Sequence, residues 1–405
     1  MAEGGNRSLG DAKKAKNDEF YTQYSDIEAE MNAYVEFNKD VFRNKTILLP
    51  CDDPEWSNFT RYFAANFQRF GLKKLISTSY TKSAGSRQLT LFEANSKAYD
   101  PELHESHGKL FVLEGDTDGN GIVDPDDIQL TGYLEGDGDF RSAEVCKLRD
   151  EADIIITNPP FSKFREFLAW ILEADKQFVI IGNMNSITYK EVFPLIKENK
   201  IWLGYSIHSG DRKFYVPEDY PLEAAGCGID ERGHRYIRVK GVRWFTNIEH
   251  GMRHQELLLD TMANNLKHNK KLRKKLEKDY GKIEYPTYDN YDALEVAFTE
   301  CIPSDYDGVM GVPITFLDKY NPEQFKVLGA TQRGCHDEVP DTKKYDSYRE
   351  MRQDGTPTGS SGGKTNENAN VEANDGKKNY FINDDGHIVQ SCYQRIFIKP
   401  RRKLA

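Results

Sequence analysis

Asn158-Pro159-Pro160-Phe161 follows directly on the apolar run ADIIIT. The side-chain amide oxygen of Asn158 and the main-chain carbonyl of Pro159 are two uncharged hydrogen-bond acceptors. Two such acceptors can draw the planar, weakly nucleophilic exocyclic amine of a nucleobase toward the tetrahedral geometry that methyl transfer requires. The fixed φ of the prolines holds the carbonyl in place, and the ring of Phe161 can stack on a base that has left the duplex. This tetrapeptide therefore predicts methyl transfer to the amine of a base.

The same four residues have a simpler interpretation. Proline has no N–H for a β ladder, so Pro159 and Pro160 can merely end a strand, with Phe161 in the core. The context favours the functional interpretation, because an apolar strand precedes the tetrapeptide and a helical pattern follows it. Open α/β sheets bind their ligands at the carboxyl ends of such strands.

The elements around the tetrapeptide alternate between strand and helix from about residue 46 to residue 248. We expect helices at residues 57–71, 162–176 and 188–199, the first with Ser57 as N-cap. Strand–helix alternation of this kind predicts a doubly wound, Rossmann-like α/β sheet. The expected strands are residues 46–50, 73–78, 109–116, 152–157, 177–183, 201–205 and 242–248.

The character of the sequence changes after residue 250. A long helical pattern with a basic end is followed by turn signals and aromatic residues. We therefore expect a catalytic domain at 17–250 and a second domain at 251–405. Residues 1–16 are polar and are expected to form a disordered arm. Residues 354–377 are poor in apolar side chains and are expected to form a mobile loop in the second domain.

The composition is that of a globular protein, with 38% hydrophobic and 30% charged residues in a chain of 405. No apolar run approaches the length of a membrane span, so we expect a cytoplasmic protein with no membrane partner. The six cysteines are scattered, which argues against a disulfide framework or a zinc site. The net charge of −10 neither supports nor excludes a nucleic-acid partner, because binding depends on where the charges lie.

Several long segments resemble the EcoRI-type adenine-specific DNA methyltransferases, a class I family that uses S-adenosylmethionine. The resemblance covers nearly the whole chain and includes IIGNMNSITYKEVFPLIKENKIWLGY and IPSDYDGVMGVPITFLDKYNPEQF, which are unlike other methyltransferases. It implies a site-specific enzyme that transfers a methyl group to N6 of a flipped-out adenine in double-stranded DNA. It also implies a restriction-modification, orphan or phage modification context. The sequence contains no convincing nuclease carboxylate cluster, so we expect any cognate endonuclease to be a separate chain.

The resemblance also implies cofactor-binding residues. Segments similar to DEFYT contact the methionine part of the cofactor, PCDDP occupies the place of the first cofactor motif, and GDGDF matches the segment that holds the cofactor adenine. Asp139 is expected on the exocyclic amine of that adenine and Phe140 against its ring, although a solvated turn would also explain Asp139. The implied cofactor residues are Phe20, Tyr21, Thr22, Pro50, Cys51, Asp52, Asp53, Asp139 and Phe140.

The order of these segments makes the second domain the expected target-recognition, DNA-binding module. Its basic helical stretch carries candidate phosphate contacts at Lys270, Lys271, Lys274 and Lys275. A solvated helix end explains the same charges equally well, because cations are favoured near a helix C-terminus.

A second motif fits a different chemistry. The stretch DTDGNGIVDPDD follows the spacing of an EF-hand calcium loop, with a glycine at the sharp turn. Its alternative interpretation is an acidic surface hairpin, since the last position is Asp instead of the usual Glu. The candidate structural calcium ligands are Asp116, Asp118, Asn120, Asp124 and Asp127.

Two other functions remain open from the sequence. The same chemistry could act on RNA or on a protein glutamine, whose amide presents a similar planar NH₂. A calcium-stabilised nucleic-acid-binding module with an inactive site would need no chemistry at all, but the intact tetrapeptide at 158–161 argues against it.

Overall fold

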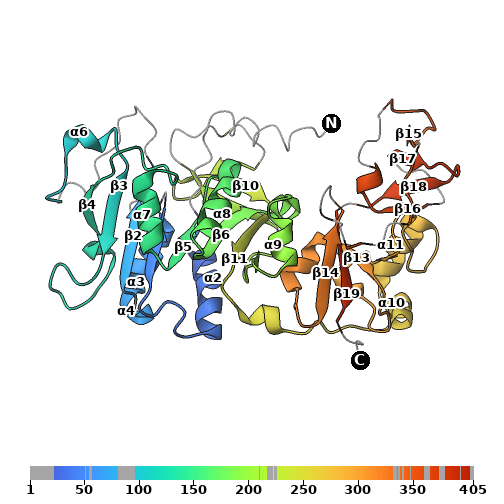
Figure 1. The fold of residues 1–405 in the computed structure, drawn as a ribbon, viewed down its shortest axis with the longest axis horizontal. Coiled ribbons are helices and arrows are strands. Elements are labelled where there is room, and N and C mark those ends of the chain that lie inside the picture. The colour runs from blue at the N-terminus through green and yellow to red at the C-terminus, as the bar shows by residue number, and fades with distance from the viewer. Residues whose placement is uncertain are drawn as a thin grey trace. The chain divides into compact units, whose positions relative to one another are not determined.

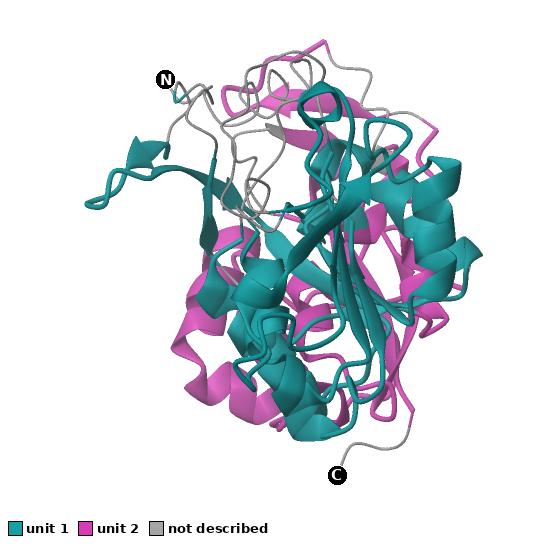
Figure 2. Ribbon diagram, turned by 90° about the vertical axis from the view of Figure 1, so that its left-hand side faces the viewer, with its two compact units in different colours: residues 1–186, 201–251 teal, residues 187–200, 252–405 magenta. Residues whose placement is uncertain are grey.

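A computed structural model of the chain separates into two compact units (Figure 2), one of residues Met1–Ser186 and Ile201–Gly251, the other of Ile187–Lys200 and Met252–Ala405. The expected boundary lay between residues 250 and 251, with residues 188–199 in the first domain. The structure describes residues 22–50, 52–53, 57–80, 96–208, 210–216, 222, 226–331, 335, 338–339, 342–346, 348–359, 365–373, 379–392 and 394–401. The expected arm at 1–16 lies outside these residues.

The first unit is built on one large sheet (Figure 1). Its helices are α2 (Tyr24–Phe37), α3 (Asn58–Ala65), α4 (Phe67–Phe70), α6 (Pro101–His104), α7 (Ala143–Glu151) and α8 (Phe164–Glu173). The strands of the large sheet are β1 (Thr46–Leu49), β2 (Lys74–Thr78), β3 (Lys109–Leu113), β4 (Gln129–Tyr133), β5 (Ile154–Thr157), β6 (Gln177–Asn183), β7 (Trp202–Leu203) and β11 (Val242–Thr246).

These eight strands lie in the order β4-β3-β2-β1-β5-β6-β11-β7. The central pairs β2–β1, β1–β5 and β5–β6 are parallel. Strand β2, which follows β1 in the chain, pairs with one side of β1, and β5 pairs with the other side. The strand order therefore reverses between β1 and β5. The fold is therefore the predicted doubly wound, Rossmann-like sheet, and its switch point lies at the carboxyl ends of β1 and β5.

Alternate side chains of the central strands face opposite layers of helices. Ile47, Leu49 and Ile154 are buried in one apolar cluster with residues of α2, α3 and α4. The intervening residues of each strand point to the other face, where Phe164 of α8 contacts Phe245 of β11 at 4.9 Å between ring centroids. Burial on both faces explains why the central strands are apolar throughout.

Local sequence signals set the ends of the helix after β1. The hydroxyl of Ser57 accepts hydrogen bonds from the N–H groups of Phe59 and Thr60, which confirms the predicted N-cap. Gly71 follows the last turn with a φ of 62°, a left-handed conformation that favours glycine. The expected single helix at 57–71 is divided into α3 and α4 at Asn66, whose side-chain amide donates to the carbonyl of Tyr62.

Other predicted elements differ from the structure. Strand β3 is antiparallel to β2, and it pairs with β4, a strand that the apolar pattern did not indicate. The helix expected at 188–199 is reduced to α9 (Phe193–Lys197). Pro194 stands in the first turn of α9, where a missing N–H costs nothing, so the helix begins at Phe193 and not at Thr188.

The first unit also contains a smaller antiparallel sheet, which the sequence did not indicate. It has the order β8-β10-β9, from β8 (Asp211–Tyr215), β9 (Gly228–Ile229) and β10 (Arg235–Lys240). Phe214, Ile237 and Val239 belong to the main apolar cluster of the unit. One face of the small sheet thus packs on the core of the large one.

The second unit holds two four-stranded sheets. One has the order β12-β13-β19-β14 and the other β15-β17-β18-β16. Besides α9, its helices are α10 (Met262–His268) and α11 (Lys270–Tyr280), and its strands are β12 (Leu294–Glu295), β13 (Met310–Pro313), β14 (Phe325–Ala330), β15 (Arg349–Arg352), β16 (Asn370–Glu372), β17 (Asn379–Ile382), β18 (Ile388–Ser391) and β19 (Arg395–Pro400). Strand β16 lies within the segment 354–377 that was expected to be a loop.

Short 3₁₀ helices complete the described chain. They are η1 (Pro125–Asp127), η2 (Phe161–Lys163), η3 (Met184–Thr188), η4 (Gly251–His254), η5 (Thr299–Cys301), η6 (Ile314–Lys319) and η7 (Thr365–Glu367). None of the helices in the described chain is both long and apolar enough to cross a bilayer.

Candidate active site

The carboxyl ends of β1 and β5 form the centre of the site. The two strands pair in parallel through Ile47 with Ile154 and Leu48 with Ile155. The loop after β1 and the tetrapeptide after β5 therefore begin side by side. The hydroxyl of Thr157, the last residue of β5, lies 2.9 Å from the carbonyl oxygen of Pro50, the first residue after β1.

Asp52 joins the ends of three strands and one helix. One oxygen of its carboxyl group lies 2.5 Å from the hydroxyl of Thr157, and the other accepts from the hydroxyl of Ser57 at 2.8 Å. Its main-chain carbonyl accepts from the hydroxyls of Ser77, at the end of β2, and Thr60, in α3. Burial raises the pKa of Asp52 to about 7, although the hydrogen bonds from Thr157 and Ser57 act to lower it.

The tetrapeptide forms a turn between β5 and α8. Asn158 is half-buried, and Pro159 is buried behind it. Pro160, with φ −53° and ψ 122°, leads into η2, which runs directly into α8. The ring of Phe161 meets the ring of Phe214 edge-on, with centroids 6.4 Å apart. The small sheet thus supports the aromatic residue of the turn, a contact that the sequence did not indicate.

Thr22 lies beside the start of α3. Its carbonyl accepts a hydrogen bond of 2.7 Å from the side-chain amide of Asn58. Its hydroxyl is buried and has no hydrogen-bond partner among the residues that the structure describes. A buried hydroxyl without a partner is costly, so it indicates a polar ligand group at this position.

Asp139 and Phe140, predicted to hold the cofactor adenine, lie in a tightly bonded turn. The carboxylate of Asp139 accepts from Arg141 at 2.7 Å and from Lys163 at 3.3 Å, and the bonds from Arg141 lower its pKa far below the usual range. Phe140 is 3% exposed and packs against Phe167 of α8. The adenine contact stays a prediction, and it requires that Arg141 or Lys163 release an oxygen of Asp139.

The other predicted cofactor residues divide into two groups. Pro50 and Asp53 lie in the loop after β1, next to the end of β5, with Pro50 buried and Asp53 half-buried. Phe20, Tyr21 and Cys51 lie outside the described residues.

The residues present fit a methyl donor with several polar groups. The buried hydroxyl of Thr22, beside the start of α3, and the polar residues that follow β1 and β5 are candidate partners for those polar groups. A doubly wound sheet with Asn-Pro-Pro-Phe at the carboxyl end of a central strand defines a Rossmann-like methyltransferase. The chain belongs to the family described as adenine-specific methyltransferase EcoRI, whose family model matches residues 8–270 and 261–401.

Three bacterial relatives agree with this assignment. The chain is 45% identical to the type II methyltransferase M.EcoRI of Escherichia coli, over 80% of this chain and 89% of the relative. It is 33% identical to M.MgeORF184P of Mycoplasma genitalium, over 78% and 84%. It is 32% identical to M.MpnI of Mycoplasma pneumoniae, over 78% and 83%. The protein is therefore an adenine-specific methyltransferase, and S-adenosylmethionine is the methyl donor that this family implies.

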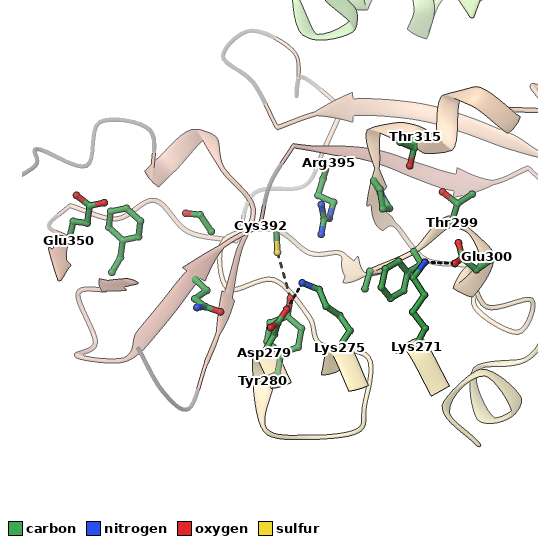
Figure 3. Close-up of a pocket in the computed structure, with 16 residues that line it drawn as sticks. Lys271, Lys275, Asp279, Tyr280, Thr299, Glu300, Thr315, Glu350, Cys392 and Arg395 are labelled. Carbon is green, nitrogen blue, oxygen red and sulfur yellow. Dashed lines mark hydrogen bonds and ion pairs between the residues drawn. The ribbon is translucent and has the colours of Figure 1, made fainter. Parts of the chain in front are cut away.

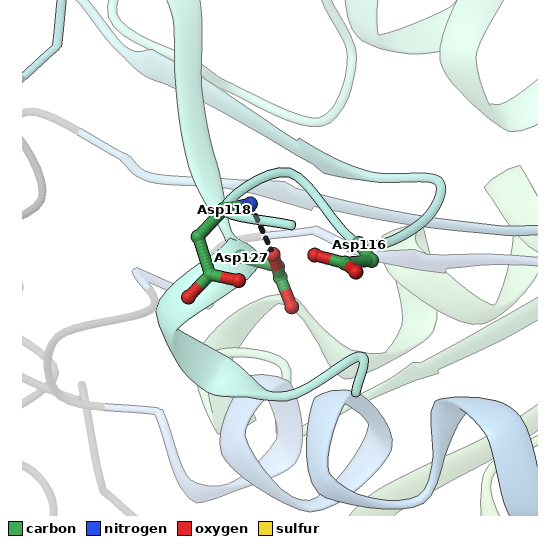
Figure 4. A group of neighbouring side chains, drawn as sticks. All are labelled: Asp116, Asp118 and Asp127. Carbon is green, nitrogen blue, oxygen red and sulfur yellow. Dashed lines mark hydrogen bonds between the residues drawn. The ribbon is translucent and has the colours of Figure 1, made fainter. Parts of the chain in front are cut away.

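The acidic loop between β3 and β4 brings three of its five predicted calcium ligands together (Figure 4). Carboxylate oxygens of Asp116, Asp118 and Asp127 all lie within 4.8 Å of one another. The N–H groups of Gly121 and Gly119 lower the pKa of Asp116. Burial raises the pKa of Asp127, but hydrogen bonds, foremost from the Thr117 N–H, outweigh it.

The two remaining predicted ligands have other bonds. Asp124 caps η1 by accepting from the N–H of Asp126 at 2.8 Å. The side-chain amide of Asn120 donates to Asp118 at 2.9 Å, and its oxygen accepts from the N–H of Ile122.

The four predicted phosphate contacts lie on α11, in the second unit. Leu272 and Leu276 are its buried residues, so the lysines are on the solvent side. Lys271 pairs with Glu300 at 3.0 Å and Lys275 pairs with Asp279, and both line a cavity of about 730 Å³ (Figure 3). Lys270 and Lys274 are exposed, and neither pairs with an acidic residue in the described part of the chain.

Proposed function

We propose that the protein methylates N6 of adenine in double-stranded DNA, at a specific sequence and with the adenine flipped out of the duplex. The position of Asn158 carries this proposal, because it places a carboxamide at the carboxyl end of β5, beside the end of β1. A base inside a duplex cannot reach an acceptor in such a turn, so the base must leave the stack. Membership of the adenine-specific family supports the choice of base.

Each residue of the turn has a distinct role in this proposal. The side-chain oxygen of Asn158 and the carbonyl of Pro159 accept hydrogen bonds from the adenine amine. They orient the nitrogen lone pair toward the methyl donor. Phe161 stacks on the flipped base, and its edge-on contact with Phe214 fixes the orientation of the Phe161 ring. S-adenosylmethionine supplies an electrophilic methyl group, and Thr22, Pro50 and Asp53 hold it next to the turn.

Sequencing tests the function directly. DNA from cells that express the protein is expected to contain N6-methyladenine at one recurring sequence, and DNA from cells that express Asn158→Ala is expected to lack it. Purified protein with labelled cofactor is expected to label duplex DNA in preference to RNA of the same sequence or a glutamine peptide. Label in RNA or peptide alone would overturn the choice of substrate.

The second unit is the proposed target-recognition module, and α11 is its proposed phosphate contact. Lys270 and Lys274 have no acidic partner among the described residues, so their charge is available to DNA. Lys271 and Lys275 are each held by a carboxylate, which weakens their attraction for a phosphate. Lys270 with Lys274, and Lys271 with Lys275, are thus two pairs of lysines on one helix. The pairs carry the same formal charge but differ in whether an acidic residue pairs with it.

Replacing Lys270 and Lys274 by Gln is expected to weaken specific and non-specific DNA binding alike. The slope of log K against log[salt] should flatten by about 0.9 for each lost phosphate contact. The matched control is the double replacement of Lys271 and Lys275 by Gln, which removes the same charge and should change the slope less. Equal slopes for the wild type and the first variant would contradict a phosphate contact at this face of α11.

We also propose that Asp116, Asp118 and Asp127 bind a structural calcium ion. Three carboxylates with oxygens within 4.8 Å of one another, two of them with lowered pKa values, form a ligand set that this cation prefers. The ion takes no part in methyl transfer, because the sulfonium of the methyl donor carries its own leaving group.

Calcium is expected to raise the melting temperature. An ion that binds only the native state adds about 2.7 kcal/mol at a hundredfold excess over its dissociation constant, or several degrees for a domain of this size. Asp116→Ala should abolish the rise, whereas Asp126→Asn, in the same loop but outside the cluster, should keep it. Methylation well below the melting point should survive chelation. A melting temperature that does not change when calcium is added would contradict the calcium site and show that the loop is an acidic turn.

A further inference from the structure

If Asp52 is ionised, one of the close oxygen–oxygen contacts around it has no proton and so cannot be a hydrogen bond. The Thr157 hydroxyl has one proton and two oxygen neighbours, the carbonyl of Pro50 at 2.9 Å and the carboxyl of Asp52 at 2.5 Å. A carbonyl oxygen can only accept. If the Thr157 proton points to Pro50, the short contact with Asp52 lacks a proton unless Asp52 supplies it.

The other oxygen of Asp52 has a fixed role as an acceptor. The hydroxyl of Ser57 accepts from the N–H groups of Phe59 and Thr60, at 3.1 and 3.4 Å, so its own proton is free to point at Asp52. A protonated Asp52 therefore completes one directional chain. It runs from the amides of α3 through Ser57, Asp52 and Thr157 to the carbonyl of Pro50.

The surroundings of Asp52 favour the neutral form. Asp52 is 8% exposed, and the two groups that bond to its carboxyl, from Ser57 and Thr157, are uncharged hydroxyls. The hydroxyls of Thr60 and Ser77 bond to its main-chain carbonyl. The charged group that acts on it among the described residues is Asp53, whose negative charge disfavours a second carboxylate. A raised pKa, about 7, agrees with this geometry.

We propose that Asp52 is a protonated positioning residue that locks the end of β5 to the end of β1. Thr157 immediately precedes Asn158, so the chain of hydrogen bonds fixes the peptide from which the catalytic carboxamide projects. The carboxyl group acts through Thr157 and not on the cofactor or the base. The role in catalysis rests on the proposed function, whereas the protonation of Asp52 does not.

The first test compares pH profiles of the single-turnover methylation rate at saturating cofactor and DNA. Asn at position 52 can donate to Thr157 and accept from Ser57, so Asp52→Asn reproduces the neutral form at every pH. The wild-type rate is expected to fall by about tenfold per pH unit above 7, as the proton is lost, and Asp52→Asn is expected to lack this fall. Identical profiles for the two proteins would overturn the proposal.

A matched pair of variants tests the path through Thr157. Thr157→Ser keeps the hydroxyl and should keep the alkaline fall near pH 7. Thr157→Val keeps the shape, removes the hydroxyl, and should lower the rate at pH 6.5 with little change in cofactor affinity. A rate for Thr157→Val equal to that of Thr157→Ser would show that the hydroxyl does not position the turn.

Thermal unfolding tests the protonation without any activity. The folded-state pKa of Asp52 lies above the unfolded value of about 3.9, so the native state binds the proton more tightly. The wild type should then lose stability relative to Asp52→Asn as the pH rises from about 4 to about 7, with a constant difference above that range. A difference that does not change with pH would overturn a protonated Asp52. If no substrate is methylated at any pH but the difference appears, the proposed function fails and the protonation stands.

Discussion

Asn158→Ala is expected to reduce the methylation rate by about 100-fold while cofactor affinity stays near that of the wild type. Losing one preorganised acceptor from a site that works by hydrogen bonding costs on the order of 3 kcal/mol in the transition state. Asn158 as a residue is half-buried, although its side-chain oxygen is buried, so loss of the carboxamide should leave the fold intact. Single-turnover assays with labelled cofactor measure the rate, and calorimetric titration measures the cofactor affinity.

The matched control for this prediction is Asn158→Asp. A carboxylate keeps an acceptor oxygen at the same position, so this variant should be faster than Asn158→Ala. Equal rates for the two variants would show that the acceptor is not what position 158 contributes. A wild-type rate in Asn158→Ala would remove the tetrapeptide from the mechanism altogether.

Arg395→Met is expected to destabilise the second unit more than any surface change. Arg395 bonds to both oxygens of Glu295, at 2.6 and 2.9 Å, across β19 and β12. Glu295 has no exposed side-chain surface, and Tyr288 is its other side-chain donor among the described residues. Removal of one partner from a buried pair costs about 3–5 kcal/mol, because the other charge stays buried without compensation. Calorimetry should show a fall in melting temperature of roughly 10 °C.

Two further variants separate the buried charge from other effects. The double variant Glu295→Leu with Arg395→Met removes both charges and should be more stable than Arg395→Met alone. Lys271→Met breaks a pair whose side chains are 63% and 53% exposed, so it should cost less than about 1 kcal/mol. A double variant that melts below Arg395→Met would show that shape, not charge, decides stability at this site.

Signals within a few residues of one another predicted much of the first unit. The alternation of apolar runs and helical periods indicated the doubly wound sheet, since each run is buried on both faces. Ser57 was recognisable as an N-cap, because capping depends on the next three residues. The strand, the two prolines and the aromatic residue at 152–161 could be recognised as one motif, because they too are neighbours in the sequence.

The contacts that shape the site link residues far apart in the chain. Thr157 meets Asp52 across 105 positions, and Phe161 rests on Phe214 in a sheet that no local pattern indicated. The acidic partners of Lys271 and Lys275 are likewise placed by the fold. Lysines of the same helix therefore differ in whether their charge is already paired. A hydrogen bond or an ion pair depends on distances of a few ångströms, which periodicity along a sequence does not contain. The residue types at 158–161 thus predicted the chemistry, whereas the packing of β1 against β5 placed a neutral carboxyl group behind it.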